Sequence, residues 1–350
     1  MRGVEQMSHP TSTDLSAKLG WRIEDPVIRL REWGSERVYG LPDTPTELTL
    51  GSASSCELQL RDNSTQISRQ HAKLTPFAGG WRIKDLNSKN GLWRDGARRL
   101  EFTLMPGLEI GMGSLRLVAE SRQLIALREL VCRFLGWSTQ RQDDVDEALR
   151  SLREWAALRA SLVLMGDGDL TTVARQLHAA TLGPESPFAA SKEHANGMAA
   201  RQAARHGTLW APELPPDFAA VAECLREVDN RTRLMLHARS ADDAARAATT
   251  LTACRVIALP SLNSRHAEID RLIKVCADDA AAALQAPTTG FTMNDLDVLA
   301  RLPYRGIAEL ELTVRRVVAM RTWGVSNGAA RLGITHVALL EWARRRKLGR

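Results

Sequence analysis

The stretch ISRQHAKLTPFAGGWRIKDLNSKNG, residues 67–91, decides the fold of the N-terminal part of this chain. Its middle alternates apolar and polar residues around a turn signal at Gly79-Gly80, which indicates short β-strands. A polar loop stands at each end, one beginning at Ser68 and the other running from Asp85 to Gly91. The second loop closes with Asn90-Gly91, a pair that favours a tight turn.

The same pattern of short apolar segments and turn signals continues on both sides of this stretch. Short apolar segments are separated by turn signals at Pro42-Asp43, Asp95-Gly96 and Pro106-Gly107. Regularly spaced short strands are typical of a sandwich or barrel. We therefore expect residues 21–120 to form an all-β sandwich.

Composition indicates an ordinary globular protein, with 44% hydrophobic and 25% charged residues among 350. No apolar run is long enough to span a bilayer, and residues 1–20 lack the apolar core of a secretory signal. We expect those residues to be a disordered lead-in, the location to be cytoplasmic, and a membrane to play no part. The five cysteines and eight histidines show no metal or redox spacing, so we expect no metal and no cofactor.

Two polar motifs and a glycine follow one another at characteristic spacing: Leu50-Gly51, then Ser68-Arg69-Gln70-His71, then the segment from Asp85 to Gly91. This order resembles the forkhead-associated (FHA) domain, a phosphothreonine-binding β-sandwich, over about a hundred residues. A phosphate needs several convergent donors on a rigid scaffold.

The resemblance assigns roles to individual residues. It implies that Ser68, Arg69, Lys89 and Asn90 bind the phosphopeptide, while Gly51, His71, Asp85 and Gly91 are structural. The family has an arginine after its first glycine, where this chain has Ser52, and this removes a guanidinium that contacts phosphate. Arg61 or Arg69 is a possible substitute, and a sandwich kept only for protein contact is the alternative.

After about residue 121 the composition becomes rich in Ala, Leu and Arg, and the apolar residues recur at helical spacing. Apolar residues recur at three and four from Asp144 to Leu158, which predicts an amphipathic helix. The apolar runs Ser161–Met165 and Arg233–His237 are candidate buried strands. Residues 121–288 are therefore expected to form an α/β domain in which helices dominate.

This middle region carries a series of short motifs in a fixed order. They are Gly166-Asp-Gly168 with Ala174-Arg175, Pro187-Phe188, Gly207-Thr208-Leu209, Leu259-Pro260 and Tyr304-Arg305-Gly306. Their order resembles the AAA+ domain of the sigma-54 enhancer-binding transcription activators, some of which also carry an N-terminal FHA domain.

The residues that such a domain needs for catalysis are missing. The loop at Gly166 and Gly168 is about two residues short of a P-loop and holds no lysine. Pro212 occupies the position of the metal-binding aspartate and leaves Glu213 alone, and Ala308 replaces a nucleotide-sensing arginine. We expect a degenerate nucleotide site at Gly166, Gly168 and Glu213, no enzyme activity, and a role as spacer or oligomerisation platform.

Residues 289–350 are predicted to be helical, comprising a lid remnant and a helix-turn-helix. The segment from Ser326 to Trp342 resembles the Fis-type helix-turn-helix that ends the same activators, with a turn at Gly333. Candidate DNA-binding residues are Thr335, His336, Arg344, Arg345, Arg346 and Lys347. The net charge of +6 is compatible with nucleic acid, although a plain helical hairpin with a basic tail is the alternative.

These segments together predict a multidomain transcription regulator without ATPase activity. It would bind a phosphothreonine-containing protein through the FHA domain and DNA through its C-terminus, and a homo-oligomer or an intact sigma-54 activator is a possible further partner. One alternative is a phosphoprotein-binding adaptor in Ser/Thr kinase signalling with no DNA role. Another is a residual ATPase with a relocated site.

Overall fold

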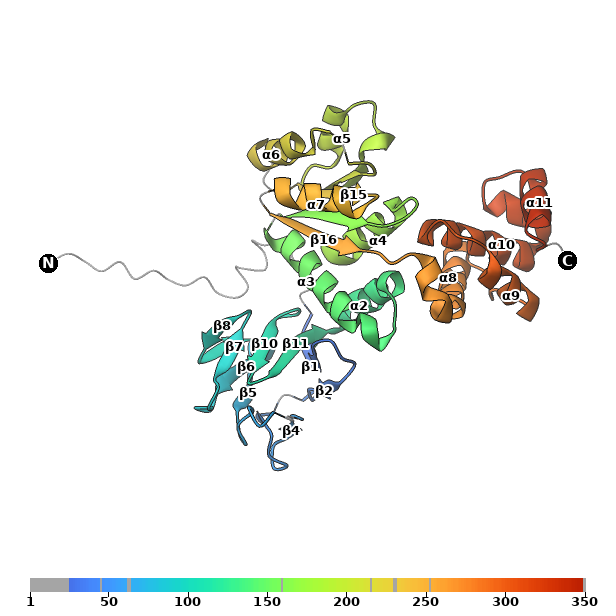
Figure 1. Ribbon diagram of the computed structural model, residues 1–350. Coiled ribbons are helices and arrows are strands. Elements are labelled where there is room, and N and C mark those ends of the chain that lie inside the picture. Colours follow the sequence, from blue (N-terminus) through green and yellow to red (C-terminus); the bar gives the residue numbers. More distant parts are fainter. Residues whose placement is uncertain are drawn as a thin grey trace.

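The computed structural model describes residues 25–44, 46–61, 64–158, 160–214, 216–228, 232–251 and 253–348. The predicted lead-in, residues 1–20, lies outside them. Along the described chain, a β-sandwich is followed by a domain with a parallel sheet and then by a group of helices (Figure 1). The protein is therefore multidomain, with a helical C-terminal region.

The N-terminal sandwich is built from two sheets. The first has the order β2 (Val38–Gly40), β1 (Val27–Glu32), β11 (Leu115–Ser121), β10 (Glu109–Met112), β7 (Leu92–Arg94) and β8 (Ala97–Arg99). The second has the order β4 (Leu58–Gln59), β3 (Leu48–Gly51), β5 (Ala72–Phe77), β6 (Gly80–Asp85) and β9 (Glu101–Thr103). Alternate residues such as Leu30, Leu74 and Ile110 fill the space between the sheets, and all three are fully buried.

Two helices cover part of the outer face of the first sheet. These are α2 (Arg122–Leu135) and α3 (Gln142–Leu158), with the short η1 (Thr139–Arg141) between them. Val118 of β11 points away from the sandwich core and joins the apolar cluster formed by these helices. The helix predicted from Asp144 to Leu158 is confirmed and begins two residues earlier.

The central domain contains a five-stranded parallel sheet, in which the predicted strand Ser161–Met165 is confirmed as β12. The other strands are β13 (Phe188–Ala190), β14 (Thr208–Ala211), β15 (Arg233–Ala238) and β16 (Cys254–Ala258), in the spatial order β13-β14-β15-β12-β16. Between them run α4 (Thr171–Leu182), η2 (Ser191–Glu193), α5 (Gly197–Ala203), α6 (Phe218–Val228) and α7 (Ala241–Thr250).

The strand order places a topological switch at the first strand. From β12 the chain crosses to one edge of the sheet, returns strand by strand to β15, and then passes to the other side as β16. In open parallel sheets the crevice outside the carboxyl ends of the strands at such a point is the usual ligand site. The loop after β12 opens at this crevice.

The C-terminal region consists of helices. They are η3 (Leu262–Glu268), α8 (Ile269–Leu284), α9 (Met293–Arg301), α10 (Ile307–Arg331) and α11 (His336–Arg345). Helix α10 is interrupted at Gly324, whose backbone has φ 74° and ψ 176°. No helix in the described ranges combines the length and the apolar character that crossing a bilayer requires.

Arg133 near the end of α2 joins three parts of the molecule. Its guanidinium donates to Glu311 of α10 at 2.7 Å, and it also pairs with Asp279 of α8. Burial tends to lower the pKa of Arg133, but Cys276 and these carboxylates raise it overall. The helix that follows the sandwich is thus tied directly to the C-terminal helices.

Candidate functional site

The first loops of the candidate site are held together by backbone hydrogen bonds. The N–H of Ser52 donates to the carbonyl of Ser68 at 3.1 Å, and the N–H of Ala53 donates to that of Arg69 at 3.1 Å. A Cβ on Gly51 would stand 2.1 Å from the Arg69 carbonyl oxygen. Only glycine therefore permits this close approach.

His71 connects the two polar loops from inside the sandwich. Its side chain is fully buried, and its Nδ1 accepts a hydrogen bond from the N–H of Ser68 at 3.1 Å. Nε2 lies 3.1 Å from the carbonyl oxygen of Gly91, so Nε2 carries the hydrogen. The geometry gives His71 a structural position between the two loops.

The second loop is shaped by a network around Ser88. The Ser88 hydroxyl donates to Asp85 Oδ1 at 2.6 Å and accepts from the N–H of Gly91 at 3.0 Å. Gly91 has φ 75°, in the left-handed region that favours glycine. These contacts fix the turn that carries Lys89 and Asn90.

The two loops meet at Ser68, whose hydroxyl accepts a hydrogen bond from the N–H of Lys89 at 3.0 Å. Beside it, the Asn90 side-chain amide donates to the carbonyl of Gln66 at 2.7 Å. The side chains of Arg69 and Lys89 are exposed, and neither forms an ion pair within the described ranges. The structure thus brings together the four residues predicted to bind a phosphopeptide.

Two further residues bear on this site. The Ser52 hydroxyl, at the position of the missing arginine, donates to the Ile67 carbonyl at 3.1 Å and remains beside the loops. Arg98 of β8, which the sequence did not single out, lies over Gly91, with its Nε 2.4 Å from where a Cβ would stand. Position 98 lies in a short exposed strand with no motif of its own, so no sequence signal points to it.

A separate pocket of about 780 Å³ lies at the switch point of the parallel sheet. Gly166 and Gly168 line it, together with His237 of β15. Both His237 ring nitrogens face carbonyl oxygens at 3.0 Å, those of Pro212 and Gly166. The loop that was predicted to be a degenerate nucleotide site therefore lies where a parallel sheet usually places its ligands.

Residues in and beside this pocket contact one another. A Cβ on Gly168 would stand 2.9 Å from the Arg305 carbonyl oxygen, so the chain itself covers the loop. Glu213 pairs with Lys192 at 2.8 Å and with Arg239 at 3.0 Å. Lys192 first, and then Arg239, lower the pKa of this exposed carboxyl.

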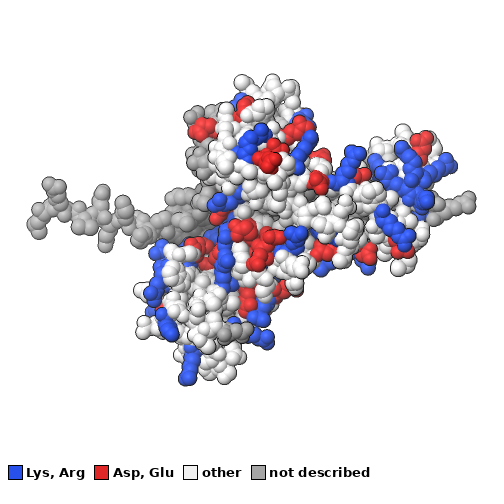
Figure 2. Space-filling view, in the orientation of Figure 1, with Lys and Arg blue, Asp and Glu red and all other residues white. Residues whose placement is uncertain are grey.

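The C-terminal candidate residues lie on and beside α11. Thr335 caps this helix by accepting from the N–H of Ala338 at 3.2 Å, after a turn at Gly333 with φ 68°. All members of the set except Arg346 are exposed, namely Thr335, His336, Arg344, Arg345 and Lys347. Figure 2 shows Lys and Arg side chains gathered at this end of the molecule.

Arg346 differs from the other basic residues of α11 and its end. It is half-buried, and its guanidinium lies 5.1 Å from the centre of the Trp342 ring. It also lies 4.0 Å from Glu309. Its contacts are therefore largely internal.

Comparison with known families assigns the N-terminal domain. Residues 48–113 match the family model of the FHA domain, and the chain therefore contains an FHA domain. Such a domain implies phosphothreonine-dependent binding of a partner protein. No curated protein matches the chain at a significant level.

Solved structures are also similar to the N-terminal part. The FhaA FHA domain complexed with the intracellular domain of Rv3910 is 27% identical, with 26% of this chain and 96% of that chain covered and a TM-score of 0.24. The Slr1951 protein from Synechocystis sp. is 28% identical over 27% and 94% of the two chains, with a TM-score of 0.24. Mycobacterium tuberculosis EmbR in complex with a low-affinity phosphopeptide is 26% identical over 26% and 24%, also at 0.24.

Proposed function

We propose that this protein is a phosphothreonine-dependent regulator that binds its phosphorylated partner at the loops carrying Ser68 and Asn90. One observation carries this proposal: the hydrogen bond from the N–H of Lys89 to the Ser68 hydroxyl joins both loops at 3.0 Å. Lys89 and Arg69 on the same two loops have exposed side chains that form no ion pair with any other described residue, and such cations suit a dianionic phosphate. Asn90 lies next to them and is suited to hold the main chain of a peptide.

The test is a titration of the full chain with a degenerate phosphothreonine peptide library and the same peptides unphosphorylated. We expect binding that requires the phosphate and that falls about tenfold or more in Ser68→Ala, since a charge-assisted hydrogen bond is lost. The exposed Ser264→Ala, far along the chain, is the matched control and is expected to bind as the parent does. Equal binding of phosphorylated and unphosphorylated peptides would reject the proposal.

A second function, DNA binding by the C-terminal helices, is favoured by the exposed cations of α11. Arg344, Arg345 and Lys347 share one end of the molecule, and Thr335 starts the helix with a side-chain cap. A helix that begins at a capped turn and carries exposed arginines suits insertion beside phosphates. In this proposal the regulator couples a partner's phosphorylation to occupancy of DNA, alone, as a homo-oligomer, or with an intact sigma-54 activator.

The dependence of DNA affinity on salt tests this second function. The double variant Arg344→Ala with Arg345→Ala removes two exposed cations and is expected to reduce the slope of log K against log salt by about 2. The matched control is Arg98→Ala with Arg99→Ala, which removes the same charge from the sandwich. An unchanged slope, or equal loss in both double variants, would favour the adaptor without a DNA role.

The central domain enters this proposal as an AAA+-like domain without ATPase activity. The parallel sheet with its pocket at the switch point supports descent from a nucleotide-binding fold. The Arg305 backbone against Gly168 and the pairing of Glu213 with two cations support the loss of hydrolysis. Titration with a labelled ATP analogue and magnesium is expected to show no binding, whereas saturable binding would revive the residual-ATPase alternative.

A further inference from the structure

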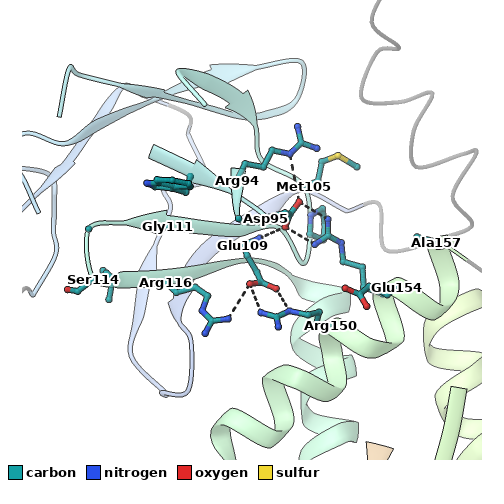
Figure 3. Close-up of a pocket in the computed structure, with 16 residues that line it drawn as sticks. Arg94, Asp95, Met105, Glu109, Gly111, Ser114, Arg116, Arg150, Glu154 and Ala157 are labelled. Atoms are coloured by element: carbon teal, nitrogen blue, oxygen red, sulfur yellow. Dashed lines mark hydrogen bonds and ion pairs between the residues drawn. The ribbon is translucent and has the colours of Figure 1, made fainter. Parts of the chain in front are cut away.

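A groove of about 800 Å³ separates the FHA sandwich from α3. One wall is the outer face of β7 and β10, and the other is the C-terminal half of α3 (Figure 3). Its apolar surface is contributed by Trp93, Met105, Pro106, Leu115 and Ala157. Trp93 is 40% exposed, a large aromatic surface that no described residue covers.

Several charged residues along the groove form ion pairs with one another. Glu109 accepts from Arg150 at 2.6 Å and lies 3.5 Å from Arg116. Asp95 pairs with Arg153 at 3.2 Å. Figure 3 draws these contacts as dashed lines, together with the one between Arg94 and Asp95. A ligand in this groove therefore meets apolar walls above paired charges, which favours apolar side chains over charged ones.

The groove opens next to the loops of the candidate phosphopeptide site. The indole N–H of Trp93 donates to the carbonyl of Asn90 at 3.1 Å. At the same end, a Cβ on Gly113 would stand 2.6 Å from the carbonyl oxygen of Gln66, two residues before Ser68. Trp93 and Gly113, which line the groove, thus contact residues of the phosphopeptide loops, and the two surfaces are adjacent.

We propose that the groove between the sandwich and α3 binds apolar residues that flank the phosphothreonine in the same partner segment. The proposal rests on phosphothreonine binding at Ser68 and Asn90, and it adds a second contact surface that the sandwich alone does not have. The partner then touches both the FHA domain and α3. Preference for the partner is set jointly by the phosphate and by apolar side chains at a distance from it.

Two sets of phosphothreonine peptides test this assignment. The short set carries about three residues on either side of the phosphothreonine, in the best sequence from a degenerate library. The long set adds about six residues, chosen among Leu, Ile and Phe, at one end or the other, which span about 20 Å when extended. Binding of both sets to the full chain is measured by calorimetry.

The variant Ala157→Trp fills the groove from its helical wall, away from the phosphate loops. The matched control is Ala126→Trp on the exposed face of α2, which makes the same change outside the groove. Equal affinity of the short peptide for the parent chain and both variants shows that the chains fold and that the phosphate loops are intact.

We expect one of the long sets to bind the parent and Ala126→Trp about tenfold more tightly than the short peptide, as for burial of one apolar side chain. This gain is expected to disappear in Ala157→Trp. If long and short peptides bind the parent equally, or if the gain survives in Ala157→Trp, the groove proposal is wrong while phosphothreonine binding stands. If no phosphorylated peptide binds at all, both fail together.

Discussion

Arg31 of β1 and Asp146 of α3 form a buried ion pair between the FHA sandwich and the helices that follow it. Each side chain is 1% exposed, and the Arg31 Nη1 donates to Asp146 Oδ2 at 3.0 Å. The same carboxylate accepts from the N–H of Gly34 at 2.7 Å, and Arg31 Nε donates to Glu120 at 2.6 Å. Burial alone would lower the pKa of Arg31, but Asp146 and Glu120 raise it overall.

Removing one partner of this pair is expected to destabilise the fold strongly. In Asp146→Ala the guanidinium of Arg31 keeps Glu120 and the carbonyls of Glu32 and Ser35 but loses its bidentate partner. We expect this to cost about 3–5 kcal/mol in the free energy of unfolding. Urea denaturation followed by circular dichroism measures this loss. Asp144→Ala removes an exposed pair with Arg141 from the same helix and is expected to cost under about 1 kcal/mol. Equal effects in the two variants would mean that the buried pair contributes little.

Gly51 and Gly40 provide a matched pair for testing the close approach of the loops. Gly51→Ala would place a Cβ 2.1 Å from a backbone oxygen, whereas a Cβ at Gly40 meets nothing within 4 Å. We expect Gly51→Ala to lose about 1–3 kcal/mol of stability and to weaken phosphopeptide binding because the Ser68 loop is displaced. Gly40→Ala should change neither by more than about 0.5 kcal/mol. Thermal unfolding and peptide titration of both variants decide the matter.

Restoring the arginine of the family pattern is expected to increase affinity for the phosphate. In Ser52→Arg the guanidinium starts from a backbone whose N–H already bonds the carbonyl of Ser68. Two charge-assisted hydrogen bonds predict a gain of about tenfold or more in phosphopeptide affinity. Ser52→Lys adds the same charge without the planar fork and is expected to gain less. No gain in Ser52→Arg, measured by peptide titration, would show that position 52 does not reach the phosphate.

Because the Asp295 carboxyl group ionises, we expect the stability of the C-terminal helices to depend on pH. The Asp295 carboxylate is fully buried and accepts from the N–H and the hydroxyl of Thr292, the N-cap residue of α9. It also accepts from Arg321 Nη2 at 2.6 Å. Burial tends to raise the pKa of Asp295, but Arg321 and Thr292 lower it overall from 3.8. Its contribution is therefore fully present above the unfolded value near 3.8 and is lost as pH falls through the lower folded pKa.

The neutral variant Asp295→Asn should lack this acid-dependent loss and should be less stable than the parent at neutral pH. Asp297→Asn changes an exposed carboxylate on the same helix and serves as the control. Helical signal is followed against urea at pH values from 7 down to below 3.8. A parent and an Asp295→Asn variant with parallel pH profiles would contradict the assignment.

Local patterns in the sequence predicted much of the sandwich and its site. The spacing of Gly51, Ser68, His71 and Asn90 matches the FHA pattern. This spacing was recognisable in the sequence because each of these residues makes a close backbone contact that requires its residue type. The apolar run at Ser161–Met165 is the interior strand β12, which pairs with β15 and β16. Such runs are recognisable because a strand covered on both faces tolerates few polar residues.

Contacts between distant segments had no such local signal. Arg31 and Asp146 are 115 residues apart, and each alone resembles an ordinary charged surface residue. Arg98 lies over Gly91 because β7 and β8 pair, which composition does not reveal. Ser326, where the resemblance to a helix-turn-helix begins, falls inside the helical segment that resumes after Gly324. The positive φ of Gly324 could not be predicted from the spacing of the apolar residues.

The interruption at Gly324 determines the direction in which the last two helical segments leave the rest of α10. With φ 74° it takes a backbone form that other L-residues rarely adopt, and the chain after it folds back on itself. A Cβ on Gly328 would stand 2.6 Å from the carbonyl oxygen of Ala319, so the two arms of the helix touch. The direction of the basic helix α11 thus depends on the φ and ψ angles of Gly324. If α10 were straight, the exposed arginines of α11 would lie on another side of the protein.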